Sequence, residues 1–312
     1  MPRFANYEYH EKIGQGSFGT IYKGTNIKTG EQVVVKMEPF EATNKLTAFS
    51  ALKHESNILN ILYSKNCRNI PPTYWYGTIA EPPPRRVLVM PFYEESLERV
   101  IGEKDPAIAS NIMRSAISIL EHIHAKYVIH RDIKPANFMI HNNELILIDF
   151  GLATFYVDSD EKHILPSTET TKKQHIIGTP KYASWNIHCG EEYSRRDDLM
   201  SIVYIGLFLL YGTGLWADNQ SFIQTDRGDP GLLSHPRNQW FKTQKSRENI
   251  MNLCSHSPTK QISVIPSGLD AFATTDAEGI DQFVPLQIFA DYIYRLSFQE
   301  RPSYTTYIRL FT

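Results

Sequence analysis

Strand-like and helix-like patterns occupy different parts of this chain, and this separation is the feature that most constrains its fold. Before residue 90, the runs 31–38 and 86–90 are rich in β-branched and other apolar residues, and 41–62 between them has helical spacing. After about residue 96 helical patterns dominate, beginning with an apolar stripe over 107–126. This order predicts an α+β chain with a small β-rich lobe and a larger helical lobe.

The predicted boundaries are 1–90 for the β-rich lobe, 91–95 for a connector and 96–312 for the helical lobe. A chain of 312 residues is about twice the ~150-residue prior for one domain, so one large domain or two lobes are expected. Within the second lobe we expect short strands at 138–140 and 145–148 and turn-rich loops at 218–239 and 266–279.

Composition and charge exclude several classes of protein. Apolar residues make up 42% of the chain and charged residues 21%, which is enough for a sizeable core and too apolar for a disordered chain. The formal net charge of 32 − 34 = −2 argues against a general nucleic-acid-binding surface. Cys67, Cys189 and Cys254 form no C-x-x-C pair, so neither a disulfide framework nor a zinc site is indicated. We expect a reducing, intracellular location, cytoplasmic or nuclear.

No segment has the pattern of an export signal or a membrane span. Residues 1–11 are polar and aromatic, without the apolar stretch of a signal peptide. The uncharged segment 199–217 is almost long enough to cross a bilayer, but it contains Tyr204 and Tyr211 and runs into the turn Gly212-Thr-Gly214. A buried helix is therefore favoured over a membrane span, and no membrane association is expected.

A glycine-rich run, Gly14-Gln-Gly16-Ser-Phe-Gly19, is the first candidate binding motif. Glycine lacks a Cβ, so a turn with this spacing can lie against phosphate groups with its N–H groups directed inward. The alternative is a dinucleotide-binding turn, which needs a helix that opens at the third glycine. Because Thr20-Ile-Tyr-Lys-Gly24 is strand-like and a turn at Lys28-Thr-Gly30 follows, a glycine hairpin between two strands fits better.

Lys36 lies in the β-run Val33-Val-Val-Lys36, about 20 residues after the glycine run. A lysine at this position is a candidate for binding the α- and β-phosphates of a nucleotide, and it needs an acidic partner. Glu55, on the intervening helix, is the preferred partner, since Glu41 lies too near the loop. The alternative for Glu55 is a position on the solvated face of that helix.

Two further motifs carry polar side chains suited to phosphoryl transfer. In His130-Arg-Asp132-Ile-Lys134-Pro-Ala-Asn137, Asp132 is suited to accept the proton of a hydroxyl and Lys134 to neutralise a transferred phosphoryl group. Asn137 and Asp149, the first residue of Asp149-Phe-Gly151, are candidate Mg²⁺ ligands, because hard cations prefer oxygen. Together with the glycine-rich run and Lys36 these make four motifs. Each of them is weak evidence by itself, but their order along the chain indicates phosphoryl transfer.

With these motifs the sequence resembles the eukaryotic protein kinases, over about residues 7–311, and within them the casein kinase 1 family. The narrower resemblance rests on 12–22, Ser96-Leu-Glu98, 130–138, Gly178-Thr-Pro-Lys-Tyr-Ala-Ser-Trp-Asn186 and Ser194-Arg-Arg-Asp-Asp198. At 184–186, Ser-Trp-Asn stands where most kinases have Ala-Pro-Glu and the family has Ser-Ile-Asn. The resemblance implies a bilobal protein-kinase fold that uses ATP and Mg²⁺, acts in signal transduction, and phosphorylates Ser or Thr hydroxyls of protein substrates. We expect a monomer, although no sequence feature sets the oligomeric state.

The resemblance also implies roles for individual residues. The catalytic set is Asp132, Lys134, Lys36, Glu55 and Thr179, with Asn137 and Asp149 as Mg²⁺ ligands. Thr179 would link the activation segment to the catalytic loop, and Asp198 would hold the backbone of that loop. The nucleotide-binding set is Ile13, Gly14, Gln15, Gly16, Ser17, Phe18, Gly19, Thr20, Ile21, Val34, Lys36, Met90, Pro91, Tyr93 and Met139. In this set Met90 would lie at the back of the adenine pocket, with Val34 in its roof and Met139 in its floor.

Substrate preference and regulation also follow from the resemblance. The family favours acceptors that are acidic or already phosphorylated upstream, through a basic anion site that corresponds to Lys181, where the family has Arg, and to Lys245. Activity is expected without phosphorylation of the activation loop. Two alternatives are a pseudokinase scaffold, which usually lacks a Lys, Asp or Asn of the catalytic set, and a kinase of small molecules, against which the segment 178–186 argues.

Overall fold

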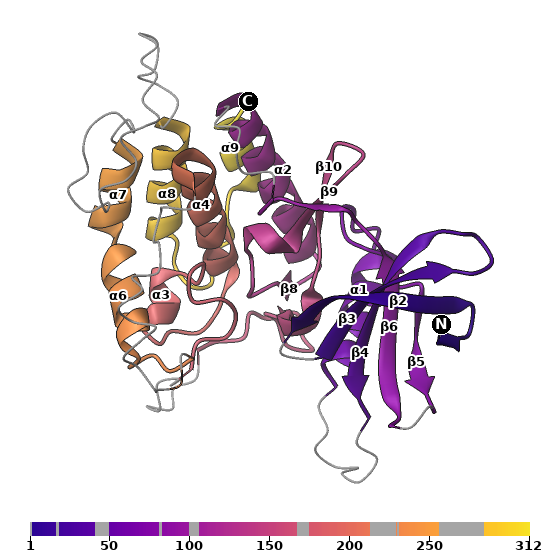
Figure 1. Cartoon of the computed structure of the whole chain (residues 1–312). Coiled ribbons are helices and arrows are strands. Elements are labelled where there is room, and N and C mark those ends of the chain that lie inside the picture. The colour runs from indigo at the N-terminus through magenta and orange to yellow at the C-terminus, as the bar shows by residue number, and fades with distance from the viewer. Residues whose placement is uncertain are drawn as a thin grey trace. The chain divides into compact units, whose positions relative to one another are not determined.

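The computed structural model describes residues 2–16, 19–40, 50–80, 83–99, 106–166, 175–212, 229, 231–255 and 284–312. The chain folds into two compact units (Figure 1). The first contains Met1–Ser96 and Phe138–Ala153, and the second contains Leu97–Asn137 and Thr154–Thr312.

The first unit is built on a six-stranded antiparallel sheet with the strand order β1-β2-β3-β4-β6-β5. Its strands are β1 (Arg3–Phe4), β2 (Tyr7–Gly16), β3 (Gly19–Asn26), β4 (Gln32–Pro39), β5 (Trp75–Ile79) and β6 (Arg85–Pro91). A smaller sheet has the order β10-β9-β7, from β7 (Glu95–Ser96), β9 (Phe138–His141) and β10 (Glu144–Leu147). The helices are α1 (Ala51–Ser64) and the short 3-10 helix η2 (Phe150–Leu152).

The two faces of β4 have different roles. Val33, Val35 and Met37 are buried in a core with apolar residues of β1, β2, β5 and β6. Because successive side chains of a strand point to opposite faces, Lys36 and Glu38 point the other way. Helix α1 packs against β4 and β6, and both charged residues bond to it, so this face carries the helix.

The segment Phe138–Ala153 belongs to the first unit, whereas the sequence patterns assigned it to the helical lobe. Strand β9 pairs with β7 in the register Glu95↔Ile140 and Ser96↔Met139, and η2 packs against α1. These contacts join residues that are far apart in the sequence. Local periodicity predicted the two short strands but carries no information about the partner that each strand chooses.

The second unit is mainly helical. Its elements are α2 (Pro106–His124), β8 (Val128–Ile129), η1 (Pro135–Asn137), β11 (Thr154–Phe155), α3 (Trp185–His188), α4 (Arg195–Tyr211), α6 (Pro236–Gln244), α7 (Arg247–Ser255), α8 (Val284–Arg295) and α9 (Tyr304–Arg309). At the start of helix α4 the Ser194 N–H donates to Asp197 Oδ2 at 2.8 Å, and the helix packs against α2 and α8. None of the helices in the described part of the chain is long and apolar enough to span a membrane.

Two sequence expectations differ from the structure at their boundaries. The helix expected at 41–62 is described as α1 from Ala51 to Ser64, and 41–49 lie outside the described residues. The loop expected at 218–239 ends in helix: α6 begins at Pro236, with His235 as its N-cap. Proline in the first turn is a helix-start signal, which the surrounding turn-forming residues obscured. Residues 218–228 and 266–279 lie outside the described residues.

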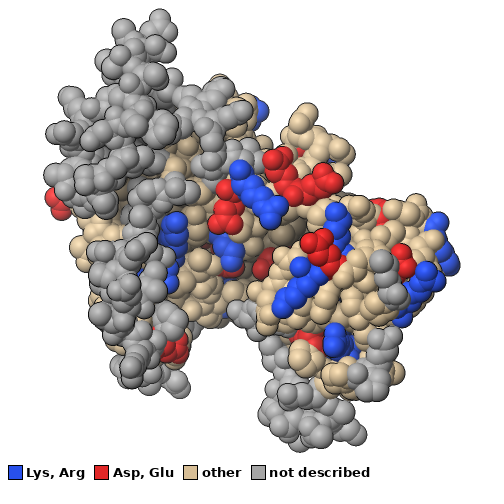
Figure 2. Space-filling model, in the orientation of Figure 1, with Lys and Arg blue, Asp and Glu red and all other residues tan. Residues whose placement is uncertain are grey.

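The surface and the cysteines match the composition. Lys and Arg side chains alternate with Asp and Glu on the face shown in Figure 2, as expected for a net charge of −2. Cys67 and Cys254 are buried, Cys189 is half-buried, and all three are free thiols. The described cysteines therefore form no disulfide framework.

Candidate active site

The glycine-rich run forms the turn end of the β2–β3 hairpin. Its register pairs Gly14 with Ile21, Gln15 with Thr20 and Gly16 with Gly19. Gly19 has a φ of +148°, and a Cβ at this position would lie 2.0 Å from the Met37 carbonyl oxygen, so a side chain does not fit. The hairpin expected from the sequence is confirmed, since a strand rather than a helix begins at Gly19. Ser17 and Phe18 lie outside the described residues.

The residues expected around the adenine lie on the strands of the first unit. Val34 and Met90 are opposite each other on β4 and β6, and Met90 is buried. Pro91 ends β6, and the half-buried Tyr93 ring lies 5.3 Å from that of His141. Burial raises the pKa of Tyr93 to about 12, with the charge of Glu31 adding to the rise, so its hydroxyl is neutral at physiological pH.

The remaining expected nucleotide contacts differ in exposure and position. Ile13 is exposed, whereas Thr20 and Ile21 are half-buried on β3. Met139 pairs with Ser96 through β9 and β7, on the smaller sheet of the first unit. The structure thus brings Val34 and Met90 together as strand partners and gives Met139 a different partner.

Lys36 is held between two carboxylates. Its Nζ donates to Glu55 Oε1 and Oε2 at 2.8 and 3.0 Å and to Asp149 Oδ1 at 2.9 Å. Burial alone would lower the pKa of Lys36, but the charges of Asp149 and Glu55 outweigh it and raise that pKa. Burial raises the pKa of Glu55, and the Lys36 ammonium opposes that rise. The first unit therefore holds a charged lysine in a fixed position on the helix-facing side of β4.

The catalytic-loop motif forms a second polar cluster, in the second unit. Asp132 Oδ2 accepts from Lys134 Nζ at 2.7 Å, and Oδ1 accepts from the Thr179 N–H and hydroxyl at 2.8 and 2.7 Å. Lys134 Nζ also donates to Thr179 Oγ1 at 3.0 Å. The Asn137 Nδ2 donates to the Asp132 carbonyl oxygen at 2.8 Å and to Oδ2 at 3.2 Å. Both carboxylate oxygens are thus oriented by donors from three residues.

Asp198, on α4, fixes the backbone that precedes Asp132. Its oxygens accept from the N–H groups of His130 at 2.7 Å and Arg131 at 2.9 Å. Arg131 has a φ of +67°, which a non-glycine residue adopts only when its surroundings hold it there. The role expected for Asp198 is confirmed by these bonds. They explain how the loop keeps a strained residue beside the Asp132 carboxylate.

A chain of buried hydrogen bonds connects Asp198 to helix α9, and the sequence motifs did not predict it. His124 contacts Asp198 Oδ2 through Nε2 at 3.0 Å and the Tyr304 hydroxyl through Nδ1 at 2.5 Å. Burial lowers the pKa of His124 although its hydrogen bond to Asp198 opposes that shift, so the ring is neutral. Burial alone would raise the pKa of Asp198, but the bonds from His124 and the backbone lower it. Nε2–H therefore donates to Asp198, and Nδ1 accepts from Tyr304.

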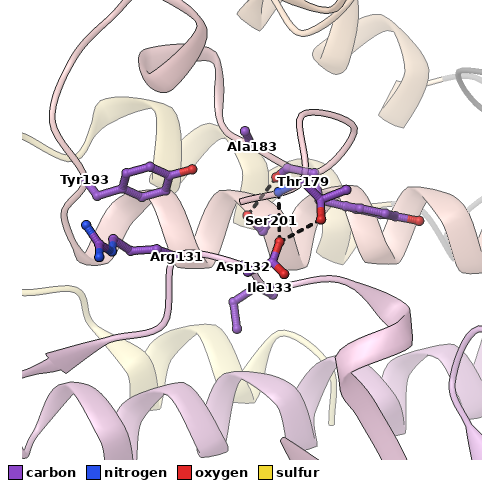
Figure 3. Close-up of a pocket in the computed structure, with 8 residues that line it drawn as sticks. Arg131, Asp132, Ile133, Thr179, Ala183, Tyr193 and Ser201 are labelled. Atoms are coloured by element: carbon purple, nitrogen blue, oxygen red, sulfur yellow. Dashed lines mark hydrogen bonds between the residues drawn. The ribbon is translucent and has the colours of Figure 1, made fainter. Parts of the chain in front are cut away.

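Gly178 allows Thr179 to reach Asp132. Gly178 has a φ of +85°, and a Cβ there would lie 2.3 Å from the Arg131 carbonyl oxygen. Any side chain would push this segment away from the catalytic loop. Figure 3 shows the Asp132 carboxylate directed at Thr179 in a small pocket. The other residues that line this pocket are Arg131, Ile133, Tyr182, Ala183, Tyr193 and Ser201.

The oxygens of Asn137 and Asp149 suit a hard cation such as Mg²⁺. Both bonds of the Asn137 amide that are described above use Nδ2, which leaves Oδ1 as the ligand atom. The Asp149 side chain is 41% exposed, and one of its oxygens binds Lys36. Among the described residues no group of three or more His, Cys, Asp or Glu side chains could hold a metal. Asn137, in the second unit, and Asp149, in the first, each offer one such oxygen, and Mg²⁺ in proteins usually takes phosphate and water oxygens as well.

The two residues of the expected anion site have different surroundings. Lys181 is half-buried, with Nζ 5.8 Å from the centroid of the Phe208 ring. Lys245 is fully buried, and its Nζ donates to the carbonyl oxygens of Pro180 at 2.9 Å and Ala183 at 2.6 Å. A side chain enclosed in this way is not available to a surface anion, so we retain only Lys181 as a candidate for that role.

Comparison with known proteins agrees with this geometry. A family model described as a protein kinase domain matches residues 7–276, which is most of the chain. Among solved structures, vaccinia related kinase 3 is similar, with a TM-score of 0.67 and 18% sequence identity. The match covers 98% of this chain and 85% of that one. At this identity the similarity concerns the fold.

Proposed function

Because the chain belongs to the protein kinase family and has its fold, we propose that it phosphorylates serine and threonine residues of proteins in the manner of the casein kinase 1 family. Kinase domains transfer the γ-phosphoryl group of ATP to a protein hydroxyl. The observation that carries the proposal is the network in which Lys134, Thr179 and Asn137 all bond to Asp132.

Asp132 acts as the base in this mechanism. Its carboxylate orients the acceptor hydroxyl and takes its proton as the hydroxyl oxygen bonds to the γ-phosphorus of ATP. The bond between that phosphorus and the β–γ bridging oxygen breaks, and ADP leaves. Lys134 stabilises the negative charge on the transferred group, since its ammonium lies 2.7 Å from Asp132 Oδ2 in the resting site.

The first unit supplies the nucleotide-binding residues of the proposal. Lys36 binds the α- and β-phosphates, and its two carboxylate contacts keep it charged and limit its motion. The glycine hairpin covers the phosphates with backbone N–H groups, since residues such as Gly14 and Gly19 add no side-chain bulk. Asn137 and Asp149 are the residues that would each offer an oxygen to Mg²⁺, which would neutralise phosphate charge when bound.

Two features favour serine and threonine as acceptors, with acidic or phosphorylated residues nearby. Lys134 and Thr179 bond to each other and to Asp132, an arrangement that the resemblance associates with Ser/Thr kinases. Lys181, two residues after Thr179, carries a positive charge on the same segment. A lysine attracts a phosphate or carboxylate as a point charge, without the bidentate geometry of arginine. The preference for primed substrates is therefore expected to be modest.

A matched peptide set tests this proposal. The full chain is incubated with Mg-ATP and peptides that differ only in a Ser, Thr or Tyr acceptor and in an upstream neutral, acidic or phosphorylated residue. We expect incorporation into Ser and Thr, and about tenfold more with an upstream anion. Lys181→Gln should reduce that preference, whereas Lys162→Gln, at an exposed lysine, should not.

Two outcomes of this experiment would contradict the proposal. Equal labelling of the tyrosine peptide would contradict the acceptor class. Binding of ATP without any transfer to the peptides would contradict the activity and support the alternative of a binding scaffold. ATP binding is measured on the same protein preparation in both cases, because a misfolded sample would fail to bind the nucleotide.

A further inference from the structure

Helix α1 is fixed to the sheet at two points, and only the Lys36–Glu55 pair was expected from the sequence. The second point is the carboxylate of Glu38, which is 7% exposed. Glu38 accepts a short hydrogen bond from the Ser50 hydroxyl and a longer one, 3.4 Å, from the Leu52 N–H. Ser50 is the N-cap of α1, so Glu38 binds the first turn of the helix that carries Glu55.

The spacing of the two points matches on both elements. Lys36 and Glu38 are two residues apart on β4, about 6.8 Å at the rise of an extended strand. Glu55 follows Leu52 by three residues and Ser50 by five, about 4.5 to 7.5 Å at the rise of an α-helix. One strand face therefore presents a cation and then an anion, and one helix presents the complementary groups at nearly the same separation.

The charges are complementary as well. The N-terminus of a helix carries partial positive charge, which favours a carboxylate such as that of Glu38. One turn further along, Glu55 is negative and bonds to Lys36 at 2.8 Å. A shift of α1 by one turn, about 5.4 Å, would break both contacts at once. The two contacts together therefore define the register of α1 on β4.

A simpler role for Glu38 is a cross-strand ion pair. Glu38 and Arg86 are register partners on β4 and β6, and Arg86 Nη1 lies 3.4 Å from Glu38 Oε1. This pair alone does not account for the bonds that Ser50 and Leu52 donate to the same carboxylate. Arg86 also lies over the Phe40 ring, with 4.8 Å to the centroid, so its charge has a second favourable contact.

We propose that Glu38 is a positioning residue that sets the register of α1 on the sheet, so that Glu55 meets Lys36 without any modification of the chain. The inference rests on the proposed kinase activity for its kinetic readout, and it concerns regulation of the same site. A kinase whose helix is fixed by its own strand has the Lys36–Glu55 pair assembled in the resting state. Glu38 acts through Glu55 and has no role in the chemical step.

A double-mutant cycle distinguishes this role from a general contribution to folding. Glu38→Ala should lower kcat/KM for ATP about tenfold, because it removes both the cap partner and the helix-end charge. In a Glu55→Gln background the same change should have little further effect, since the contact that Glu38 positions is already lost. Glu38→Asp should restore part of the activity, and Glu8→Gln, at a carboxylate that pairs with exposed Arg3, should have no effect. Independent, multiplicative effects of Glu38 and Glu55 would overturn the proposal.

Hydrogen exchange gives a readout that does not depend on activity. Amides in the first turn of α1 should exchange at least about tenfold faster in Glu38→Ala and in the milder Glu38→Gln than in the wild type. Exchange in α2 and α4 should not change. Unchanged exchange in α1 would overturn the role of Glu38, whether or not the wild type is active. A wild type that fails to transfer phosphate would contradict the proposed function alone, since the exchange test would still stand.

Discussion

Lys36, in the first unit, is half-buried and Lys245, in the second, is fully buried, and their surroundings are opposite. Lys36 lies between two carboxylates, and those charges raise its pKa. Lys245 donates to two carbonyl oxygens and lies over the rings of Tyr204 and Phe241, at 4.7 and 5.1 Å from their centroids. Burial, together with the nearby charge of Lys181, lowers the pKa of Lys245 well below its ordinary value.

The comparison shows two different uses of a lysine side chain. Lys36 stays charged and is proposed to bind a ligand, whereas Lys245 holds a segment of the chain in place. Neutral carbonyl oxygens and ring faces compensate a buried ammonium less than carboxylates do. What Lys245 secures is the segment from Pro180 to Ala183, which directly follows the Thr179 that bonds to Asp132. Lys36 is therefore suited to its proposed role in nucleotide binding, whereas Lys245 holds the shape of the segment proposed to bind the acceptor.

The largest effect is expected at Lys36. Lys36→Met removes the ammonium that is proposed to bind the phosphates and leaves Glu55 and Asp149 without their shared partner. Loss of one pre-organised electrostatic contact typically lowers kcat on the order of 10²–10³-fold. Steady-state transfer to a protein substrate measures this effect, with Lys28→Met, at an exposed turn lysine, as the matched control. Equal activity of the wild type and Lys36→Met would show that the charge at this position is not used.

A smaller effect with a different kinetic signature is expected at Lys245. Lys245→Met keeps most of the side-chain volume but removes both bonds to the 180–183 segment. We expect KM for the protein acceptor to rise by up to about thirtyfold while KM for ATP stays the same, because two hydrogen bonds of about 1 kcal/mol each are lost. Lys242→Met, in the last turn of helix α6, for which Lys245 is the C-cap, is the control. A rise in KM for ATP instead would remove the contrast between the two lysines.

The smallest effect is a pH dependence of stability at His188, whose Nε2 lies 3.4 Å from Lys245 Nζ. Burial, with the charge of Lys245, lowers the pKa of His188 from 6.5 to about 3. The folded state then binds fewer protons than the unfolded state between pH 6.5 and 3, so this contribution to stability is present above pH 6.5 and is lost as pH falls toward 3.

Urea unfolding at a series of pH values measures this contribution. The free energy of unfolding should fall less steeply between pH 6.5 and 4 in His188→Asn than in the wild type, and His122→Asn, at an exposed histidine of α2, should retain the wild-type slope. Identical slopes for His188→Asn and the wild type would show that His188 does not have the neutral, buried environment described for it.

The parts of the site that the sequence predicted are the local ones. Asp132, Lys134 and Asn137 lie within six residues, so they are brought together by a short loop whose motif is visible in the sequence. Glu55 was selected as the partner of Lys36 by its place on a helix, and the two residues do form an ion pair. The glycine hairpin was predicted because strand-like residues follow the third glycine rather than a helical pattern.

The parts that were missed depend on burial and on distant partners. Lys245 was expected to contribute to a basic anion site. Its partners are in fact backbone carbonyl oxygens, and these leave no signal in the sequence. The sequence motifs assign no role to Glu38, and only its two-residue spacing from Lys36 places both on one face of the strand. The bond between His124 and Tyr304 joins residues 180 positions apart, and neither residue belongs to a motif.

The central claim is that Asp132 is the base of a phosphoryl transfer, and transfer to casein with parallel measurement of ATP binding tests it most directly. Asp132→Asn keeps the shape of the side chain but removes the carboxylate that three residues orient. Transfer by this variant should fall on the order of 10²–10⁴-fold while its affinity for ATP stays within about twofold of the wild type. Full transfer by Asp132→Asn would contradict the account.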